Sequence, residues 1–317
     1  MNAKKINPGV ILNKYGIYIV LVVMVVILSI ISPTFFTGSN ILNILRQVSI
    51  SGILAIGMTF ILITGGIDLS IGSVLALAGV LGATFAHSEP SYPLILVLVI
   101  GIGTGVACGL INGLLISRTT INPFIVTMGM MTIARGLALL YTNGRPVTDQ
   151  SEAFSYLGRG QIGPVTFPVI LFILIAVVSI IILHKSVFGK YVYAVGGNEQ
   201  SAIVSGINTA KIKLMVYLYS GALVGLAGLL LAARTNAATP NAGDGYELDA
   251  IAAAVIGGTS TAGGKGGIYG TIVGALIMTI LANGMDILNI SSYIQQIVKG
   301  IIIIAAVFID QMNKKGK

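Results

Sequence analysis

Long apolar runs constrain this chain more than any other feature of its sequence. A helix needs about 20 apolar residues to cross the hydrocarbon core of a membrane, and runs of that length follow one another along the sequence. Backbone groups cannot stay unpaired in lipid, so these runs must form helices. The pattern predicts an all-α, multi-pass transmembrane helical bundle with about ten spans, at residues 15–33, 46–65, 69–86, 93–117, 122–141, 165–183, 213–233, 248–260, 268–286 and 293–310.

The composition excludes most soluble classes of protein. Hydrophobic residues make up 55% of the 317 residues and charged residues only 9%, against about 25% in an ordinary soluble domain. The polar side chains therefore cannot cover a domain of this size. Ten membrane helices leave roughly 100 residues for tails and loops, too few for a soluble nucleotide-binding or catalytic domain. We expect residues 1–317 to form a single membrane domain.

Metal and redox chemistry are not indicated by the sequence. It has one cysteine, Cys108, and two histidines, His87 and His184, which lie far apart along the chain. These residues cannot build a disulfide framework within one chain or a histidine-based metal cluster. We expect no metal site and no catalytic residues in this chain.

The distribution of positive charge predicts the orientation of the bundle. With the N-terminus placed in the cytoplasm, the inner segments hold twelve of the eighteen lysines and arginines, and the outer segments hold four. Cytoplasmic loops carry the excess of positive charge in membrane proteins, so both termini are expected in the cytoplasm. The net charge of +8 is then a topology signal. Because no basic patch is interleaved with aromatic residues, we expect no nucleic-acid partner.

Glycines recur at intervals of four residues in several of the expected spans. Small residues at this spacing lie on one face of a helix and let neighbouring backbones approach closely. We expect these faces to pack against other helices, and the alternative is that they slide past their neighbours during a conformational cycle. The glycines are Gly101, Gly105, Gly109 and Gly113, then Gly221 and Gly225, and finally Gly266, Gly270 and Gly274.

A polar turn between two spans covers residues 63–73, with the sequence ITGGIDLSIGS. Its glycines permit a sharp turn, and Asp68 and Ser70 can accept hydrogen bonds from free N–H groups at the start of the next helix. Irregular backbone at membrane depth occurs only where it is buried in protein or lines a cavity. The turn is thus either a capped connection or part of a solute path.

Polar side chains inside the spans are further candidates for a solute path. An ionised residue at the bilayer centre costs roughly 2.5–3.5 kcal/mol on insertion scales, so it usually has a partner or a function. Lys299 lies near the middle of the last span, and Asp286 is a candidate partner for it. Snorkelling and hydrogen bonding between helices are the alternatives. The candidate path residues are Asp68, Ser70, Asn112, Arg135, Asn283, Gln295, Gln296 and Lys299.

The longest inner loop, residues 184–212, is expected to contain a short helix outside the membrane. Asn198 is a good N-cap for a helical stretch from Glu199 to Ser205, and Gly206 is a good residue to end it. This helix is either an interfacial linker or a docking element for a cytoplasmic partner. On the outer side, either a docking surface or solvated loop ends are indicated by Arg145, Asp149, Asp244 and Glu247.

Five segments resemble the ribose-type permease subunits of bacterial ABC importers. They are ITGGIDLSIGSVLALAG at 63–79, FIVTMGMMTIARGLALLYTNGRPV at 124–147, YAVGGNEQSAIVSGI at 193–207, GYELDAIAAAVIGGTSTAGGKGGIYGT at 245–271 and NGMDILNISSYIQQIVKGIIIIAAV at 283–307. The resemblance extends over nearly the whole chain in collinear order, and together these motifs are specific for the family. One departure is Gly267, where the family pattern leads us to expect an arginine.

The resemblance implies a transmembrane permease subunit, not an enzyme, of an ATP-driven, binding-protein-dependent sugar importer in the bacterial inner membrane. Two copies would pair as a homodimer, an extracytoplasmic sugar-binding protein would deliver the solute, and a cytoplasmic ATPase subunit would hydrolyse Mg-ATP. Ribose is the expected sugar, and other pentoses, hexoses or inositol-like polyols are the alternatives. By position, the residues that would couple the chain to the ATPase are Gly197, Asn198, Glu199, Ser205 and Gly206.

Two other classes are supported less well by the residues themselves. A gradient-driven secondary transporter would favour buried acids or histidines as a proton relay, and the expected spans hold almost none. A membrane enzyme would need clustered histidines, cysteines or paired acids. The nearest match to a phosphate-binding loop, Gly264-Lys265-Gly266, lacks the Ser or Thr that follows the lysine. Any ATP that drives this protein must therefore be hydrolysed by a partner.

Overall fold

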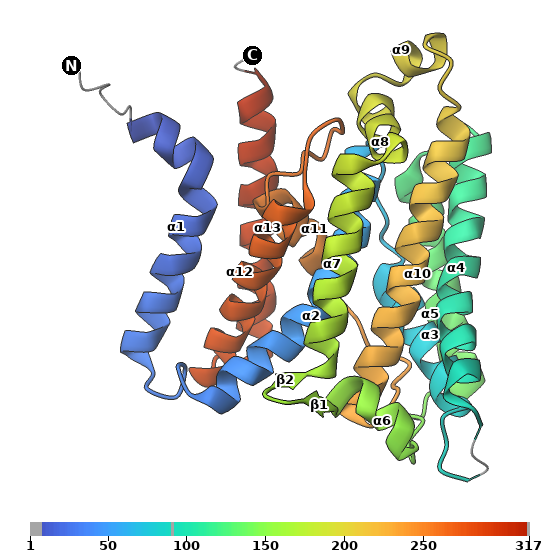
Figure 1. The fold of residues 1–317 in the computed structure, drawn as a ribbon, viewed down its shortest axis with the longest axis vertical. Helices are drawn as coiled ribbons and strands as arrows, with labels where there is room; N and C mark the ends of the chain where they lie inside the picture. Colours follow the sequence, from blue (N-terminus) through green and yellow to red (C-terminus); the bar gives the residue numbers. More distant parts are fainter. Residues whose placement is uncertain (1–7, 90–91, 316–317) are drawn as a thin grey trace.

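The computed structural model describes residues 8–89 and 92–315, which form thirteen helices and one short hairpin (Figure 1). Strands β1 (Gln161–Ile162) and β2 (Val165–Thr166) pair antiparallel. The all-α bundle predicted from the apolar runs is confirmed. The helices are α1 (Pro8–Ile31), α2 (Gly38–Ile63), α3 (Ile71–Thr84), α4 (Leu94–Arg118), α5 (Pro123–Thr142), α6 (Glu152–Arg159), α7 (Phe167–Lys185), α8 (Val187–Gly197), α9 (Glu199–Val204), α10 (Thr209–Thr235), α11 (Tyr246–Ile256), α12 (Ile268–Ile287) and α13 (Ser292–Lys315).

Each of the ten expected spans contains a helix, although α1 and α2 begin about two turns earlier than predicted. Seven helices are long and apolar enough to cross a membrane, namely α2, α4, α5, α7, α10, α12 and α13. Helices α3 and α11 have 14 and 11 residues, fewer than the roughly 20 that a crossing needs. The start of α1 and the end of α13 lie on the same side of the bundle as α9 (Figure 1). The number of crossings and the cytoplasmic location of the termini stay predictions.

Helix α2 lies at the centre of the bundle, where it packs against α7, α10, α11 and α12. From Val48 to Ile63 every residue except Ser51 is buried, as expected for a helix that is apolar on all sides. Helix α13 is the opposite case, because none of its described side chains is buried. The core therefore lies around α2, and α13 lies at the edge of the bundle.

Helices α4 and α10 meet backbone to backbone along the glycine face predicted from the sequence. A Cβ atom on Gly105 would overlap the carbonyl oxygen of Gly221, and one on Gly109 would overlap that of Tyr217. The same close approach joins α11 to α12, where a Cβ atom on Gly270 would overlap the Gly257 carbonyl. Small residues bring these backbones into contact, so the packing interpretation of the glycine pattern is confirmed.

Both long loops contain more structure than the sequence predicted. The outer loop holds α6 and the β1–β2 hairpin. The inner loop holds two helices instead of one, because α8 precedes α9 and ends with Gly196 and Gly197. These glycines were interpreted as the approach to the short helix, whereas they form the last turn of another. Asn198 lies between the two helices, and its side chain caps α9 as predicted by accepting the Ser201 N–H at 2.8 Å.

The contact between α4 and α10 can be tested with two glycines of α4. We expect Gly105→Ala to destabilise the folded chain by about 1–3 kcal/mol, because the new methyl group overpacks a backbone contact. Gly103 is exposed on the same helix and has open space around it, so Gly103→Ala should leave the stability unchanged or raise it slightly. Thermal unfolding of the detergent-solubilised variants measures both. Equal melting temperatures would contradict the packing argument.

Candidate functional site

A polar cavity of about 420 Å³ opens among α2, α10, α11, α12 and α13. This volume lies in the range of roughly 300–1,000 Å³ that is typical of small-molecule sites. Amide, hydroxyl and charged groups around one cavity can donate to and accept from the hydroxyls of a polar solute. The polar side chains that line it are Gln47, Ser51, Arg234, Thr235, Tyr246, Asp249, Thr279, Asp286, Gln295 and Lys299.

Lys299 and Asp249 form an ion pair in the wall of this cavity, with Lys299 Nζ 2.8 Å from Asp249 Oδ2. The predicted pairing of Lys299 with Asp286 is wrong. Asp286 instead accepts a hydrogen bond from Gln295 Nε2 at 2.8 Å. The short connection between α12 and α13 places Asp286 opposite the first turns of α13, where Gln295 lies. Lys299 lies one turn further along and faces α11.

A second cleft, of about 440 Å³, lies between α11 and α13. Asp249, Gln295 and Lys299 line both cavities, so the ion pair belongs to the wall that the two share. The predicted path residue Gln296 lines this second cleft. Three of the eight predicted path residues, all of them on α13, thus lie beside a cavity large enough for a small solute.

Asp68, Ser70 and Asn112 form a closed cluster that lines neither of these cavities. Asp68 Oδ1 accepts hydrogen bonds from the Ser70 N–H at 2.8 Å and from its hydroxyl at 2.6 Å. Asn112 donates to Ser70 Oγ at 3.1 Å, and all three side chains are buried. The capping predicted for Ser70 is wrong, because its hydroxyl donates to Asp68 and makes no capping bond to α3. The space beside the cluster is only about 10 Å³.

The two other predicted path residues make contacts between helices and loops. Asn283 exchanges hydrogen bonds with Asn40 at 2.9 and 3.0 Å, which joins α12 to α2. Arg135 donates from α5 to the carbonyls of Pro240 and Ala242 in the segment that precedes α11. Hydrogen bonding between helices was the alternative expected for Asn283, whereas Arg135 bonds to a loop and does not snorkel to the surface as its alternative expected.

The residues predicted for docking on the outer side divide into two groups. Arg145, Asp149 and Asp244 are exposed. Glu247 is partly buried in the first turn of α11, where its carboxylate lies beside Gly72 of α3. Gly72 and Gly243 are in backbone contact, since a Cβ atom on either would clash with the carbonyl oxygen of the other. The start of α3 and the segment that leads into α11 are therefore in direct contact.

The end of the bundle that carries α8 and α9, predicted to be the inner one, contains a junction of three backbone segments. The Ile63 carbonyl, at the end of α2, accepts the Gly264 N–H at 2.9 Å, and Gly196 of α8 packs onto both groups without room for a Cβ atom. Tyr193, also on α8, donates from its hydroxyl to the Gly266 carbonyl at 2.8 Å. Burial raises the pKa of this tyrosine above its ordinary value, so it stays a donor at neutral pH. Helix α8 thus touches both the end of α2, where the turn 64–70 begins, and the turn 257–267.

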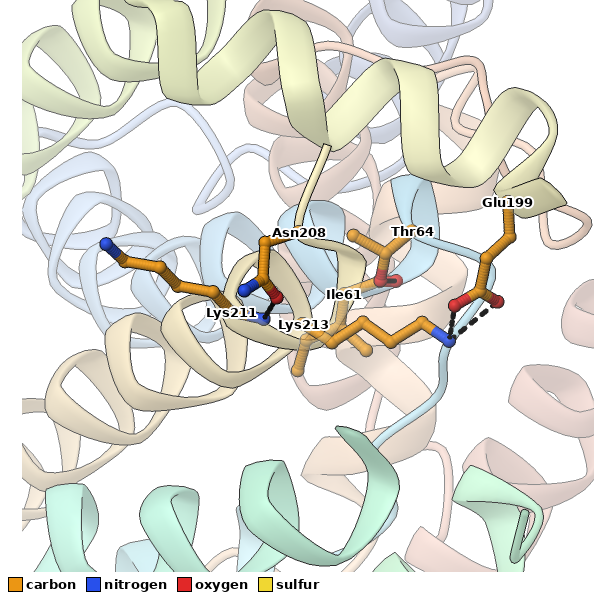
Figure 2. A network of polar contacts seen from close by, with 6 residues as sticks. All are labelled: Ile61, Thr64, Glu199, Asn208, Lys211 and Lys213. Atoms are coloured by element: carbon orange, nitrogen blue, oxygen red, sulfur yellow. Dashed lines mark hydrogen bonds and ion pairs between the residues drawn. The ribbon is translucent and has the colours of Figure 1, made fainter. Parts of the chain in front are cut away.

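Beyond this junction, α9 stands at the inner surface with its predicted helix ends confirmed. Gly206 has a positive φ of 81°, and the Ser205 hydroxyl donates to the Ser201 carbonyl at 2.8 Å. Figure 2 shows Lys213 of α10 between both carboxylate oxygens of Glu199, at 2.6 and 2.8 Å. This ion pair ties α9 to the start of α10.

Three residues of these sites were missed in the sequence. Gly196 has the close contacts, whereas a Cβ atom on the predicted Gly197 would meet nothing within 4 Å. Asp249 was not among the predicted site residues. Asp310 accepts three hydrogen bonds from Ser260 and Thr261 in the turn after α11, at 3.0 to 3.2 Å. The sequence signal for Asp310 was its position as an acid in the last apolar run. The roles of Gly196 and Asp249 depend on tertiary contacts, and no sequence signal marked them.

The seven long apolar helices found in the described residues are those of a multi-pass membrane protein. A family profile described as "Branched-chain amino acid transport system / permease component" matches residues 40–307. The chain therefore belongs to this family of transport permeases.

Several relatives are similar over nearly the whole chain. The ribose import permease protein RbsC of Bacillus subtilis is 45% identical, over 97% of this chain and 96% of its own. The RbsC of Escherichia coli K12 is 44% identical, over 94% and 92%. An L-arabinose ABC transporter permease, AraH of Azospirillum brasilense, is 38% identical, over 96% and 90%. No solved structure matches the chain.

The junction at the inner end predicts different outcomes for two adjacent glycines. Gly196→Ala should lower the melting temperature and the yield of folded protein, because its methyl group would displace the Ile63 carbonyl or the Gly264 amide. Gly197→Ala, with open space around it, should behave like the unmodified chain. Thermal unfolding in detergent, with membrane yield from immunoblots, measures both. A lower melting temperature or yield for Gly197→Ala than for Gly196→Ala would contradict this description of the junction.

Proposed function

We propose that the chain is the transmembrane permease subunit of an ATP-driven, binding-protein-dependent sugar importer, with ribose as the solute. The observation that carries this proposal is the similarity of nearly the whole chain to ribose import permeases. The polar cavity supports it, because its mixed donors and acceptors suit a small polyhydroxylated solute. The L-arabinose permease among the relatives makes other monosaccharides the alternative solutes.

The inner face is the proposed docking site of a cytoplasmic ATPase subunit that binds and hydrolyses Mg-ATP. Helix α9 presents Glu199 at the surface, with its side chain 41% exposed. Helix α8 belongs to the same loop and packs at Gly196 on the end of α2 and on the turn 257–267. A push on α8 and α9 would therefore reach the turns 64–70 and 257–267 through backbone contacts, and would switch the bundle between outward-open and inward-open states.

The outer face is the proposed docking site of an extracytoplasmic sugar-binding protein. Exposed charges at Arg145, Asp149 and Asp244 suit a surface that steers and orients a partner. We further propose that two copies of the chain pair, that the bundle lies in the bacterial inner membrane, and that both termini are cytoplasmic. Glu247 lies in the same region, but its side chain is partly buried.

The energy source separates this proposal from a gradient-driven transporter. We expect uptake of labelled ribose that depends on this chain to be lost when ATP is depleted, and to continue when ion gradients are collapsed with ATP preserved. The measurement uses cells that carry the partner genes, with and without the chain. Uptake that survives ATP depletion and stops with the gradients would overturn the proposal in favour of a secondary transporter.

Glu199 tests the docking role of α9. Exposed ion pairs contribute about 0–1 kcal/mol, so Glu199→Gln and Lys213→Gln should both leave the melting temperature nearly unchanged. If the Glu199 carboxylate contacts the ATPase, Glu199→Gln should lower ATP-driven uptake by about tenfold, the effect of losing a hydrogen bond to a charged group. Lys213→Gln is the matched control, because it removes the same ion pair and keeps the carboxylate. Equal uptake by both variants would contradict a docking role for Glu199.

A further inference from the structure

The ion pair between Asp249 and Lys299 lies where two cavities meet. Asp249 belongs to the first turn of α11, and Lys299 lies on α13. Both side chains line the 420 Å³ cavity and the 440 Å³ cleft, and they are 19% and 27% exposed. A solute in either cavity can therefore reach the pair.

The pair leaves hydrogen-bonding capacity unused. Asp249 Oδ1 is buried and has no hydrogen-bond partner in the described part of the chain, because Lys299 bonds to Oδ2 alone. A buried carboxylate oxygen without a donor is costly. The lysine ammonium has three donors, and Asp249 takes one of them. A hydroxyl group both donates and accepts, so when the pair separates one solute hydroxyl can donate to the carboxylate and another can accept from the ammonium.

The charges around the pair favour a neutral solute. Four acids line the two cavities, namely Asp244, Glu247, Asp249 and Asp286, against two basic residues, Arg234 and Lys299. An excess of negative charge disfavours an anion such as a phosphorylated sugar. A neutral polyol avoids that repulsion and still uses the donors and acceptors on both sides of the pair.

Helix α13 lies at the edge of the core, because none of its described side chains is fully buried. Its second half packs against the core through Ile302, Ile303, Ala306 and Val307. In its first half, side-chain hydrogen bonds join Gln295 to Asp286 and Lys299 to Asp249. Because lipid provides little hydrophobic force between helices, these polar contacts help to hold the first half of α13 in place. Exchanging the bond at Lys299 for bonds to a solute would release one of them.

We propose that the Asp249–Lys299 pair is a solute-binding gate, which opens when the hydroxyls of a neutral monosaccharide replace the bond between the two side chains. The inference rests on the proposed function and adds the residues that bind the solute. The bound solute would lie between α11 and α13, and the pair would close again behind it. The pair is thus a contact for the solute as well as a link between two helices.

The test uses the full chain assembled with its ATPase and binding protein in lipid vesicles, where ribose uptake and ATP hydrolysis are both measured. Asp249→Asn and Lys299→Met remove one side of the pair, and Lys299→Arg keeps the charge and the donors. Glu152→Gln is the matched control, since Glu152 also lies in the first turn of a helix and lines neither cavity. The readout is the number of sugars transported per ATP hydrolysed.

We expect Asp249→Asn and Lys299→Met to lower the transport ratio at least about tenfold, as expected for lost hydrogen bonds to charged groups. ATP hydrolysis should persist, Lys299→Arg should retain more transport than Lys299→Met because it keeps the charge, and Glu152→Gln should transport normally. A purely structural link would instead lower transport and hydrolysis together through loss of assembled complex, and this would overturn the inference. An unchanged ratio in both variants would also overturn it. If the unmodified chain transports no sugar at all, the proposed function itself fails.

Discussion

The bundle depends on helices that approach one another at the level of their backbones. In lipid, apolar side chains do not drive helices together as they do in water, so close packing and hydrogen bonds must hold them. Helix α10 meets α4 through Gly221 and meets α3 through Gly228, while α8 meets the end of α2 through Gly196. Of the two short helices, α3 is held by this contact with α10, and α11 by a close approach to α12 at Gly257 and Gly270. The 420 Å³ cavity lies among α2, α10, α11, α12 and α13, beside these close backbone contacts.

Polar contacts have a different role at the edge of the bundle. The Asp68–Ser70–Asn112 cluster makes its hydrogen bonds within the protein, and the space beside it is only about 10 Å³. At α13, the Asp249–Lys299 pair lines two cavities of about 420 and 440 Å³. The same residue types therefore lie in a tightly packed part of the molecule in one place and beside room for a solute in another. The proposed transport function depends on both parts.

Most local signals were read correctly from the sequence, although the cap predicted at Ser70 was wrong, and among tertiary contacts only the glycine packing faces were predicted. Apolar runs predicted the helices, and Asn198 and Gly206 predicted the ends of α9, because these effects act within a few residues. The existence of α8 was missed because its terminal glycines were interpreted as a loop. The partner of Lys299 was predicted to be Asp286 and is Asp249, because the pairing depends on which turn of α13 faces α11. Gly196 and Gly197 are adjacent residues of the same type. They differ in the tertiary contacts around them, which the sequence does not show.

The contact between Gly72 and Gly243 has a consequence for how such proteins can diversify. Together with the junction at Gly196, it completes a route of main-chain atoms from α8, through the turn 64–70 and the start of α3, to the start of α11. The route contains glycine and backbone groups, whereas the cavity is lined by side chains. Residues that contact the solute can therefore change without altering the route. The same arrangement of main-chain contacts can therefore be kept in permeases for different small solutes.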